Sequence, residues 1–426
     1  MHDVFENLPF QGANILLPKS GDMQKWSVVA CDQYTSQPEY WARVSDFVGN
    51  EPSSLHLILP ESRLEGPDVE QNIQEINRTM NGYLNEHVFA EYSNSVFYVE
   101  RRLDNGKVRR GLVGMVDLEE YAYKPSSAAL IRATEGTVLS RIPPRVAVRE
   151  NALIELPHIM LLTDDPDKTV IEPLGEQTHG MECVYDFQLM ERGGHISGWK
   201  LTEEQMAHVA KALRVLADPA VFSERYHTRN LPVLLFAVGD GNHSLATAKE
   251  CYERQKKSVP ADQWAGLPAR YALAEIVNLH DESLEFEAIH RVVFDVDPKH
   301  LLDAFLDAYH GAYIGRGAGH VIEYICDGED GFLTVPAPSA QLEVGTLQNF
   351  LDTYLKEHGG RVDYIHGEDV TRQLAAQKGC IGFLLPAMSK DQLFPTVIFD
   401  GALPRKTFSM GEAHDKRCYL EARKIR

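Results

Sequence analysis

The chain has 426 residues, of which 44% are hydrophobic and 24% charged, a composition typical of a protein that fills more than one hydrophobic core. It carries 42 Lys and Arg residues against 62 Asp and Glu residues, so its formal net charge is −20. Nucleic acids and anionic membranes attract proteins with a broad basic surface, so this charge argues against both classes of partner and leaves room only for a locally basic pocket.

Neither the N-terminal residues nor the cysteines indicate export. The first residues lack a basic segment followed by an apolar run, so no signal peptide is predicted, and no stretch reaches the roughly 18 apolar residues of a membrane-spanning helix. The 6 cysteines include no C-x-x-C pair, which fits neither a zinc ribbon nor a disulfide scaffold. We therefore expect a cytoplasmic protein.

Residues 1–125 are expected to form an N-terminal α/β region. The expected elements are two short strands, a long helix and a hairpin: 26–31, 55–59, 68–89 and 95–118. The hairpin prediction depends on Asn105 and Gly106, because this dipeptide tolerates the positive φ angles of a tight turn between two segments rich in Val, Phe and Tyr.

Residues 126–295 are expected to form the core of the protein. An apolar run at 156–163 predicts a buried strand, and Thr202 with Gln205 forms the capping-box pattern of a helix start. A second apolar run, 231–238, is followed by the sequence GDGNHS and then by a strong helix former at 245–256. This pattern predicts a buried strand that turns at glycines directly into a helix.

Residues 296–426 are expected to form a C-terminal α/β region that packs on the core. Asp297-Pro298 predicts the start of a helix through residue 309, and 346–358 predicts a second helix ended by two glycines. The glycines of 314–319 precede a hairpin pattern rather than a helix, so they indicate a turn and not a dinucleotide-binding loop.

The GDGNHS sequence is the strongest candidate for a ligand site. A strand that turns into a helix points unpaired backbone N–H groups and the positive end of the helix dipole at one place, which favours anions. Gly241 lets a ligand approach the backbone, Asp240 can accept a hydroxyl proton or hold a divalent cation, Asn242 can orient a polar group, and His243 and Ser244 can donate to phosphate. The alternative is an ordinary turn in which Ser244 only caps the helix.

A second candidate segment has the sequence IRATEGT, residues 131–137. Glu135 is a candidate general base, and Arg132 and Thr137 are candidate phosphate ligands together with the arginines that follow, Arg141, Arg145 and Arg149. The alternative is a solvated loop with surface ion pairs.

Two more candidates lie towards the C-terminus. Lys406 and Thr407 belong to a basic, hydroxyl-rich cluster in which Lys406 can bind phosphate as a point charge. The alternative is a basic surface turn, which composition alone slightly favours. His290 and Arg291 precede a β-rich run and either face a substrate pocket or cap a strand. The sequence contains no P-loop, no G-x-S-x-G elbow and no H-E-x-x-H pattern, so the familiar NTPase and hydrolase routes are unsupported.

Taken together, these segments resemble the DUF1015 family, a family of unknown function. Its members carry a His-Glu-x-Thr element, an Asp-Gly-His-His-Arg element after a strand, a His-Arg pair and a Pro-x-Lys-Ser/Thr element. The corresponding segments here are 134–137, 240–244, 290–291 and 404–407. Thr134, Asn242 and Ser244 depart from the family pattern, and the last of these replaces an arginine.

The Asp-Gly-His-x-Arg element is itself similar to the nucleotide-binding loop of the ParB and sulfiredoxin superfamily, which includes ParB-like free-serine kinases. The resemblance implies an α/β or α+β fold: a mixed sheet with a ParB/sulfiredoxin-like core elaborated at both ends. It also implies that Glu135 activates a substrate hydroxyl, that Asp240 positions this hydroxyl or an Mg²⁺ ion, and that Gly241, His243 and Ser244 bind phosphate.

These observations favour a nucleotide-dependent phosphotransferase that acts on a small hydroxylated metabolite, with ATP, ADP or CTP and Mg²⁺ as the expected cofactors. Two other functions stay open: a non-catalytic sensor of a nucleotide or phosphometabolite, and an acidic module that docks a basic protein partner. A sulfiredoxin-like redox role is disfavoured because no cysteine lies between residues 231 and 248.

Overall fold

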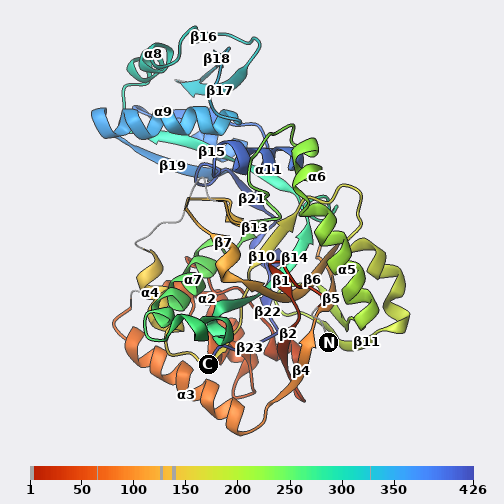
Figure 1. Cartoon of the computed structure of the whole chain (residues 1–426). Helices are drawn as coiled ribbons and strands as arrows, with labels where there is room; N and C mark the ends of the chain where they lie inside the picture. Colours follow the sequence, from red (N-terminus) through yellow and green to blue (C-terminus); the bar gives the residue numbers. More distant parts are fainter. Residues whose placement is uncertain (1–3, 65, 125–127, 137–140, 327) are drawn as a thin grey trace. The chain divides into compact units, whose positions relative to one another are not determined.

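The computed structural model describes residues 4–64, 66–124, 128–136, 141–326 and 328–426, and the chain forms two compact units. Unit 1 comprises residues 1–284 and 412–426, and unit 2 comprises residues 285–411. Both chain ends belong to unit 1 (Figure 1). The three regions with boundaries at residues 125 and 295 stay predictions. Across the described ranges, no helix combines the length and the apolar character needed to cross a membrane.

Unit 1 is built on a 10-stranded mixed sheet with the strand order β11-β12-β5-β6-β14-β10-β13-β8-β7, to which β1 adds at β6. The strands are β1 (Phe10–Gln11), β5 (Phe97–Arg102), β6 (Val108–Asp117), β7 (Tyr121–Ala122), β8 (Ile131–Ala133), β10 (Met160–Thr163), β11 (Glu182–Gln188), β12 (His195–Lys200), β13 (Phe236–Asp240) and β14 (Tyr271–Asn278). Strand β13 runs parallel to β8 and antiparallel to β10. The predicted mixed α/β fold is therefore confirmed.

Helices and small strand pairs surround this sheet (Figure 1). The helices of unit 1 are α1 (Met23–Trp26), α2 (Pro38–Val48), α3 (Val69–Asn85), α4 (Ile142–Arg149), α5 (Glu203–Leu216), α6 (Pro219–Arg225) and α7 (Asn242–Lys256). The paired strands are β2 (Ala13–Pro18) with β4 (Phe89–Ser95), β3 (Val28–Val29) with β22 (Cys418–Tyr419), and β9 (Ile154–Glu155) with β23 (Arg423–Lys424). Short 3-10 helices lie at Ser54–Leu57, Glu61–Arg63, Leu118–Glu120, Glu172–Gly180, Ala261–Gly266, Pro268–Arg270 and Ala413–Asp415.

Unit 2 has its own 7-stranded sheet with the order β16-β18-β17-β20-β15-β19, and β21 pairs with β15. Its strands are β15 (Phe286–Phe294), β16 (Tyr313–Ile314), β17 (His320–Cys326), β18 (Glu329–Val335), β19 (Arg361–His366), β20 (Ile381–Leu384) and β21 (Phe408–Met410). Its helices are α8 (Pro298–Ala308), α9 (Glu343–His358), α10 (Glu368–Ala375) and α11 (Lys390–Phe399). The glycines of 315–319 precede the β17–β18 hairpin, so the turn interpretation is confirmed.

Several local predictions are confirmed by the structure. Strands β5 and β6 form the predicted hairpin, and Gly106 in its turn has φ 85°. The Thr202 hydroxyl accepts from the backbone N–H of Gln205, whose side chain accepts in return from the Thr202 N–H, so α5 starts with the predicted capping box. The predicted helices beginning near residues 68, 245, 297 and 346 appear as α3, α7, α8 and α9.

The strand predicted at 55–59 is wrong. Ser54–Leu57 forms a 3-10 helix because Ser53 accepts a hydrogen bond from the Leu55 N–H and donates to the Lys25 carbonyl at 2.6 Å. These serine side chain bonds offer the backbone a turn in place of a strand ladder. The strand predicted at 26–31 is shortened to β3, since α1 extends to Trp26.

The C-terminal segment 412–426 lies largely in the interior of unit 1. Leu420 accepts a hydrogen bond from the Trp26 indole at 2.9 Å, and Arg417, 6% exposed, pairs with Glu275 and Glu421 at 2.7 Å each. Arg423 pairs with the buried Glu155 at 2.7 Å. Charges this deep are tolerated only when they are paired, so the segment is an integral part of the core of unit 1.

Candidate functional site

The predicted strand, glycine turn and helix exist in the structure. Strand β13 ends at Asp240, helix α7 begins at Asn242, and Gly241 between them has φ 82°, in the left-handed region that favours glycine. A Cβ atom at this position would lie 3.1 Å from the Cα of Ile159, so the turn also packs tightly against the segment before β10. The first N–H groups of α7 therefore point out of a turn that only glycine adopts without strain.

Strand β13 is shorter than the apolar run that predicted it, since it begins at Phe236 rather than Leu231. The proline at 232 has no N–H for a sheet ladder. A bulge between β10 and β13 places Met160 opposite Asp240 and Leu161 opposite Val238. Bulges of this kind re-aim side chains beside functional sites, and here the bulge precedes Asp240 directly.

Asn242 joins the two predicted site segments. Its Oδ1 accepts from the Thr134 N–H at 3.2 Å and its Nδ2 donates to the Thr134 hydroxyl at 3.3 Å, while this hydroxyl donates to the Val238 carbonyl at 2.6 Å. Thr134 directly precedes the half-buried Glu135, so the backbone at Glu135 lies near the Gly241 turn. The Asn242 side chain itself is occupied by this bridge.

Asp240 is paired with a lysine that the sequence patterns did not single out. Its Oδ1 accepts from the Gly241 N–H at 2.9 Å, and its Oδ2 lies 3.5 Å from the Lys416 ammonium. Both side chains are largely buried, at 17% and 16% exposed. The C-terminal segment thus supplies a cation to the turn at which the family pattern has an arginine.

A buried histidine, His158, packs against the turn. Its Nε2 is 3.3 Å from the Ser244 hydroxyl and 3.6 Å from Oδ2 of Asp32, and its Nδ1 is 2.8 Å from the Tyr419 hydroxyl. Burial alone would lower the pKa of His158, but Asp32 and Asp240 outweigh burial and raise it above its ordinary value. Burial would likewise raise the pKa of Asp32, yet His158 and Gln33 hold it well below its ordinary value. Each side chain therefore favours the charged form of the other.

His243 has the opposite character. Its pKa is lowered by burial first and then by the nearby cations Arg145 and Arg141. Arg145 is itself paired with Glu61 at 2.5 Å. The Nε2 atom of His243 is buried and has no hydrogen-bond partner among the described residues. An imidazole with a lowered pKa and an unsatisfied nitrogen therefore lies in the first turn of α7.

The other predicted residues of IRATEGT do not join the turn in the described structure. The Arg132 guanidinium donates to the carbonyls of Ala129, Pro232 and Val233 at 2.9, 2.9 and 3.0 Å, and these lie towards the start of β13, whereas Asp240 lies at its end. Thr137 lies outside the described residues.

The remaining predicted residues belong to unit 2. His290 accepts from the Leu385 N–H at 3.1 Å, and burial lowers its pKa. Arg291 is fully buried and its donors reach the Gln348 side chain and the carbonyls of Ile289 and Arg405. Lys406 is exposed, and the Thr407 hydroxyl donates to the Pro404 carbonyl at 2.6 Å.

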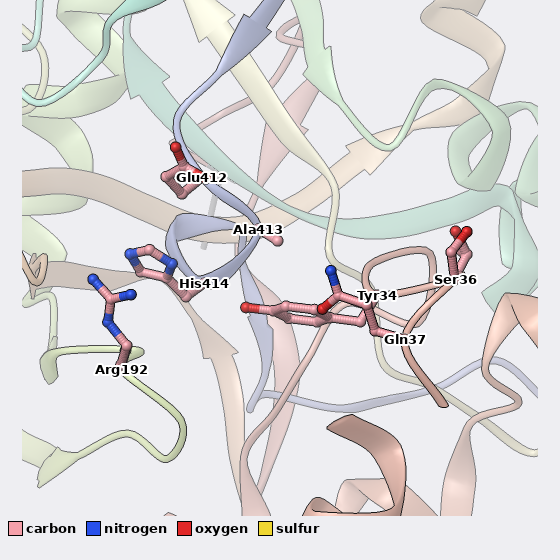
Figure 2. Close-up of a pocket in the computed structure, with 8 residues that line it drawn as sticks. Tyr34, Ser36, Gln37, Arg192, Glu412, Ala413 and His414 are labelled. Atoms are coloured by element: carbon pink, nitrogen blue, oxygen red, sulfur yellow. The ribbon is translucent and has the colours of Figure 1, made fainter. Parts of the chain in front are cut away.

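A polar cavity of about 660 Å³ lies in unit 1, a volume in the range of small-molecule sites. Its lining residues are Tyr34, Thr35, Ser36, Gln37, Arg192, Glu412, Ala413 and His414. Figure 2 shows the Tyr34 hydroxyl on the side of His414 and Arg192, with Ser36 on the opposite side. Tyr34 follows Asp32 by two residues and His414 precedes Lys416 by two, so the cavity wall is within about 8 Å of both along the backbone.

Both walls of this cavity are held in place. Tyr34 has φ 53°, a conformation rare for a bulky residue, and its ring stacks on Tyr40 at 3.7 Å. The buried Arg101 donates to the carbonyls of His414 at 2.6 Å and Lys416 at 2.5 Å. Strained backbone and buried arginine contacts of this kind are common where a site must be preorganised.

Asp32, His158 and Lys416 are the residues that sequence reasoning missed. His158 is the only ionisable side chain in the apolar run 156–163, and Asp32 directly follows the apolar run 26–31, so both were visible as polar groups beside buried strands. Lys416 carried no local signal. Its role depends on the path of the C-terminal segment through unit 1.

The predicted magnesium role of Asp240 depends on the ligand as well as the protein. Within the described parts of the chain, no group of three or more His, Cys, Asp or Glu side chains is placed to hold a metal ion. Mg²⁺ in nucleotide sites uses one or two carboxylates and completes its shell with phosphate oxygens and water. Asp240 offers one carboxylate for such an ion, and its Oδ2 already lies 3.5 Å from the Lys416 ammonium.

Comparison with known proteins identified one family and several distant folds. The family model described as "Protein of unknown function (DUF1015)" matches residues 8–354, and no curated protein matches the sequence. A variant of a free serine kinase in complex with AMP aligns over 75% of this chain and 93% of its own, at 11% identity and a TM-score of 0.40. A conserved hypothetical protein from Pyrococcus furiosus aligns over 72% and 93%, at 10% identity and a TM-score of 0.36. Truncated SbnI from Staphylococcus aureus aligns over 72% and 85%, at 10% identity and a TM-score of 0.38.

Proposed function

The chain belongs to the DUF1015 family of unknown function, and from that premise we propose that it is a nucleotide-dependent phosphotransferase acting on the hydroxyl group of a small metabolite. The proposal is supported mainly by one observation. A left-handed glycine, Gly241, joins the end of a buried strand to the start of a 15-residue helix, with the Asp240–Lys416 pair beside it. Backbone N–H groups, a helix dipole and a lysine at one turn suit a phosphate group.

The reaction needs little covalent chemistry from the protein. The substrate hydroxyl oxygen forms a bond to the terminal phosphorus of the nucleotide, the bond from that phosphorus to the bridging oxygen breaks, and its electron pair stays on the departing nucleotide. The hydroxyl proton passes to a carboxylate, for which Glu135 is proposed. Mg²⁺ would neutralise phosphate charge, with Asp240 as its protein ligand. Positioning and charge stabilisation supply most of the rate in such transfers.

Within this proposal, the groups of the turn divide the work. The first N–H groups of α7 and the side chains of His243 and Ser244 bind phosphate oxygens, and Lys416 provides the positive charge that Ser244 does not. The cavity beside Asp32 and Lys416 holds the hydroxylated substrate. As part of the same proposal, the strands around β13 form a ParB/sulfiredoxin-like core.

Isothermal titration calorimetry with ATP, ADP and CTP in the presence of Mg²⁺ tests the proposal. We expect at least one nucleotide to bind, and Asp240→Asn to weaken it by about tenfold, the effect of losing one charge-assisted contact. Asp262→Asn, a change at an exposed aspartate, is the matched control and should leave binding unchanged. If none of the three nucleotides binds, the protein is not a nucleotide-dependent phosphotransferase.

A non-catalytic sensor of a nucleotide or phosphometabolite is the second candidate. It is favoured by the contacts that already engage the turn, since Asp240 is paired with Lys416 and Ser244 contacts His158. A sensor would bind nucleotide with unchanged affinity in Glu135→Gln and would transfer no phosphate to any hydroxylated acceptor. A phosphotransferase would lose turnover in the same variant.

A further inference from the structure

We infer that His158 is a positioning residue of this site: its Nε2 fixes the Ser244 hydroxyl and the Asp32 carboxylate beside the Gly241 turn, so that Ser244 donates its proton to a bound phosphate. The inference rests on the proposed function only in taking a phosphate as the ligand of the turn.

His158 occupies the point where four separate segments meet. It precedes β10 and contacts Asp32 after β3, Ser244 in the first turn of α7 and Tyr419 in β22. The ring packs directly against the turn, since a Cβ added at Gly241 would lie 3.6 Å from its Cδ2. The side chain is 4% exposed, so it acts from beneath the turn rather than from the cavity.

The hydrogen-bond partners of the His158 ring indicate a proton on each of its two nitrogens. The Tyr419 hydroxyl donates to Sγ of Cys31 at 3.0 Å and accepts from the Cys31 N–H at 3.2 Å. With its single proton committed in this way, Tyr419 accepts from Nδ1 of His158 at 2.8 Å. Nε2 lies 3.6 Å from Oδ2 of Asp32, and a carboxylate at this distance favours a proton on Nε2 over a lone pair, so we assign the second proton to Nε2.

The direction of the bond to Ser244 follows from this assignment. A serine hydroxyl has one proton to donate and two lone pairs to accept with. When Nε2–H donates to its oxygen, the Ser244 proton is left for another acceptor, and an anion above the first turn of α7 is such an acceptor. A histidine without the Nε2 proton would take the Ser244 proton and turn a lone pair towards the anion.

The charges around His158 are consistent with this state. Asp32 lies on the loop after β3, Asp240 ends β13, and both favour the protonated ring. Arg417 on the C-terminal segment opposes it, while the pKa of Asp32 is lowered by His158 itself, then by Gln33 and last by Lys416. The Cys31 thiol facing Tyr419 stays protonated, because burial and then Asp32 raise its pKa to about 12.

Two substitutions of His158 separate positioning from packing. In His158→Gln the amide nitrogen takes the place of Nε2 and keeps a donor to Ser244 and Asp32, whereas in His158→Asn it takes the place of Nδ1 and reaches only Tyr419. The affinities for ATP with Mg²⁺ and for inorganic pyrophosphate are measured by calorimetry. We expect His158→Gln to stay within about threefold of the wild type and His158→Asn to lose about tenfold or more. His208→Gln, on the exposed face of α5, should change nothing.

A double-mutant cycle adds a readout that packing alone would not move. Ser244→Ala should cost as much affinity as His158→Asn, and the double variant should cost no more than either single change, because both remove the same donated bond. Circular dichroism and thermal melting confirm that each variant is folded.

The outcomes keep the inference and the proposed function apart. Equal losses in His158→Gln and His158→Asn, or additive losses in the cycle, overturn the inference and leave the phosphotransferase standing. The expected pattern with pyrophosphate, in a protein that binds no nucleotide, supports the inference and removes the phosphotransferase. A wild type that binds neither ATP nor pyrophosphate overturns both.

Discussion

Units 1 and 2 each bury polar residues that belong to family-like motifs, but they use them differently. In unit 2, Arg291 and Thr407 donate hydrogen bonds to nearby side chains and carbonyls of the same unit. In unit 1, polar groups from four distant segments converge on one glycine turn, and the buried Nε2 of His243 has no partner among the described residues. We expect a motif residue whose side chain is hydrogen-bonded within the fold to contribute to stability. We expect polar groups around a turn with an unsatisfied nitrogen to contribute to ligand binding.

The largest expected effect concerns the core that supports the turn. Arg417→Leu leaves the buried Glu275 and Glu421 without their cation, and removing one partner of a buried ion pair costs about 3–5 kcal/mol. Urea unfolding followed by Trp fluorescence should show this loss, because Trp26 bonds to the same segment. Lys424→Leu, which breaks an exposed pair with Glu91, is the control and should cost below about 1 kcal/mol. Equal effects of the two changes would show that the segment is not a core element.

Arg291→Met tests whether a buried motif residue of unit 2 contributes to stability rather than to ligand binding. Because the buried acceptors of Arg291 would lose their donor, the free energy of unfolding should fall by about 2–3 kcal/mol. The affinity for nucleotide should stay within about twofold of the wild type. Unfolding and calorimetry on one sample measure both quantities. A variant with normal stability and lost binding would place Arg291 in the ligand site and remove the distinction between the units.

Gly241→Ala sharpens the comparison at the turn itself. A non-glycine residue at φ 82° costs about 1 kcal/mol, and the added Cβ meets the Cα of Ile159 at 3.1 Å, so the turn must shift. We expect nucleotide affinity to fall by about tenfold or more. Gly106→Ala is the matched control, because Gly106 has φ 85° in the β5–β6 hairpin with nothing near its Cβ position. Its stability should fall by a similar amount while its ligand affinity stays unchanged.

Local chemistry made much of the fold predictable from the sequence. The Asn105-Gly106 hairpin, the Thr202 capping box and the β13–Gly241–α7 turn depend on neighbouring residues, and the structure confirms them. The strand predicted at 55–59 failed because the bonds of Ser53 and Ser54 go to the carbonyls of Lys25 and Trp26, which no local pattern reveals.

Only those residues of the candidate site that lie in local sequence motifs were predictable. The GDGNHS turn and the adjacent Glu135 came from sequence patterns, and the Asn242–Thr134 bridge connects them in the structure. Lys416 and Tyr419 reach the turn because the last residues of the chain return to unit 1 and are buried there. That return depends on long-range ion pairs with Glu275 and Glu155, whose partners are far apart in the sequence.

The smallest expected effect is a difference in pH dependence between the two histidines of the turn. His158 has a raised pKa in the folded state, so its contribution to stability is complete below its unfolded pKa of about 6.5 and is lost as the pH rises through the folded pKa. His243 has a lowered pKa, so its charging opposes folding as the pH falls below about 6.5.

Urea unfolding from pH 5 to pH 9 separates these two contributions. His158→Asn should remove a decline in stability as the pH rises above about 6.5, and His243→Asn should remove a decline as the pH falls below it. Burial lowers the pKa of both histidines, but Asp32 and Asp240 outweigh burial at His158, whereas Arg145 and Arg141 add to it at His243. If both variants flattened the same limb of the profile, the turn would not hold one charged and one neutral imidazole, and the phosphate donors assigned to it would have to be reassigned.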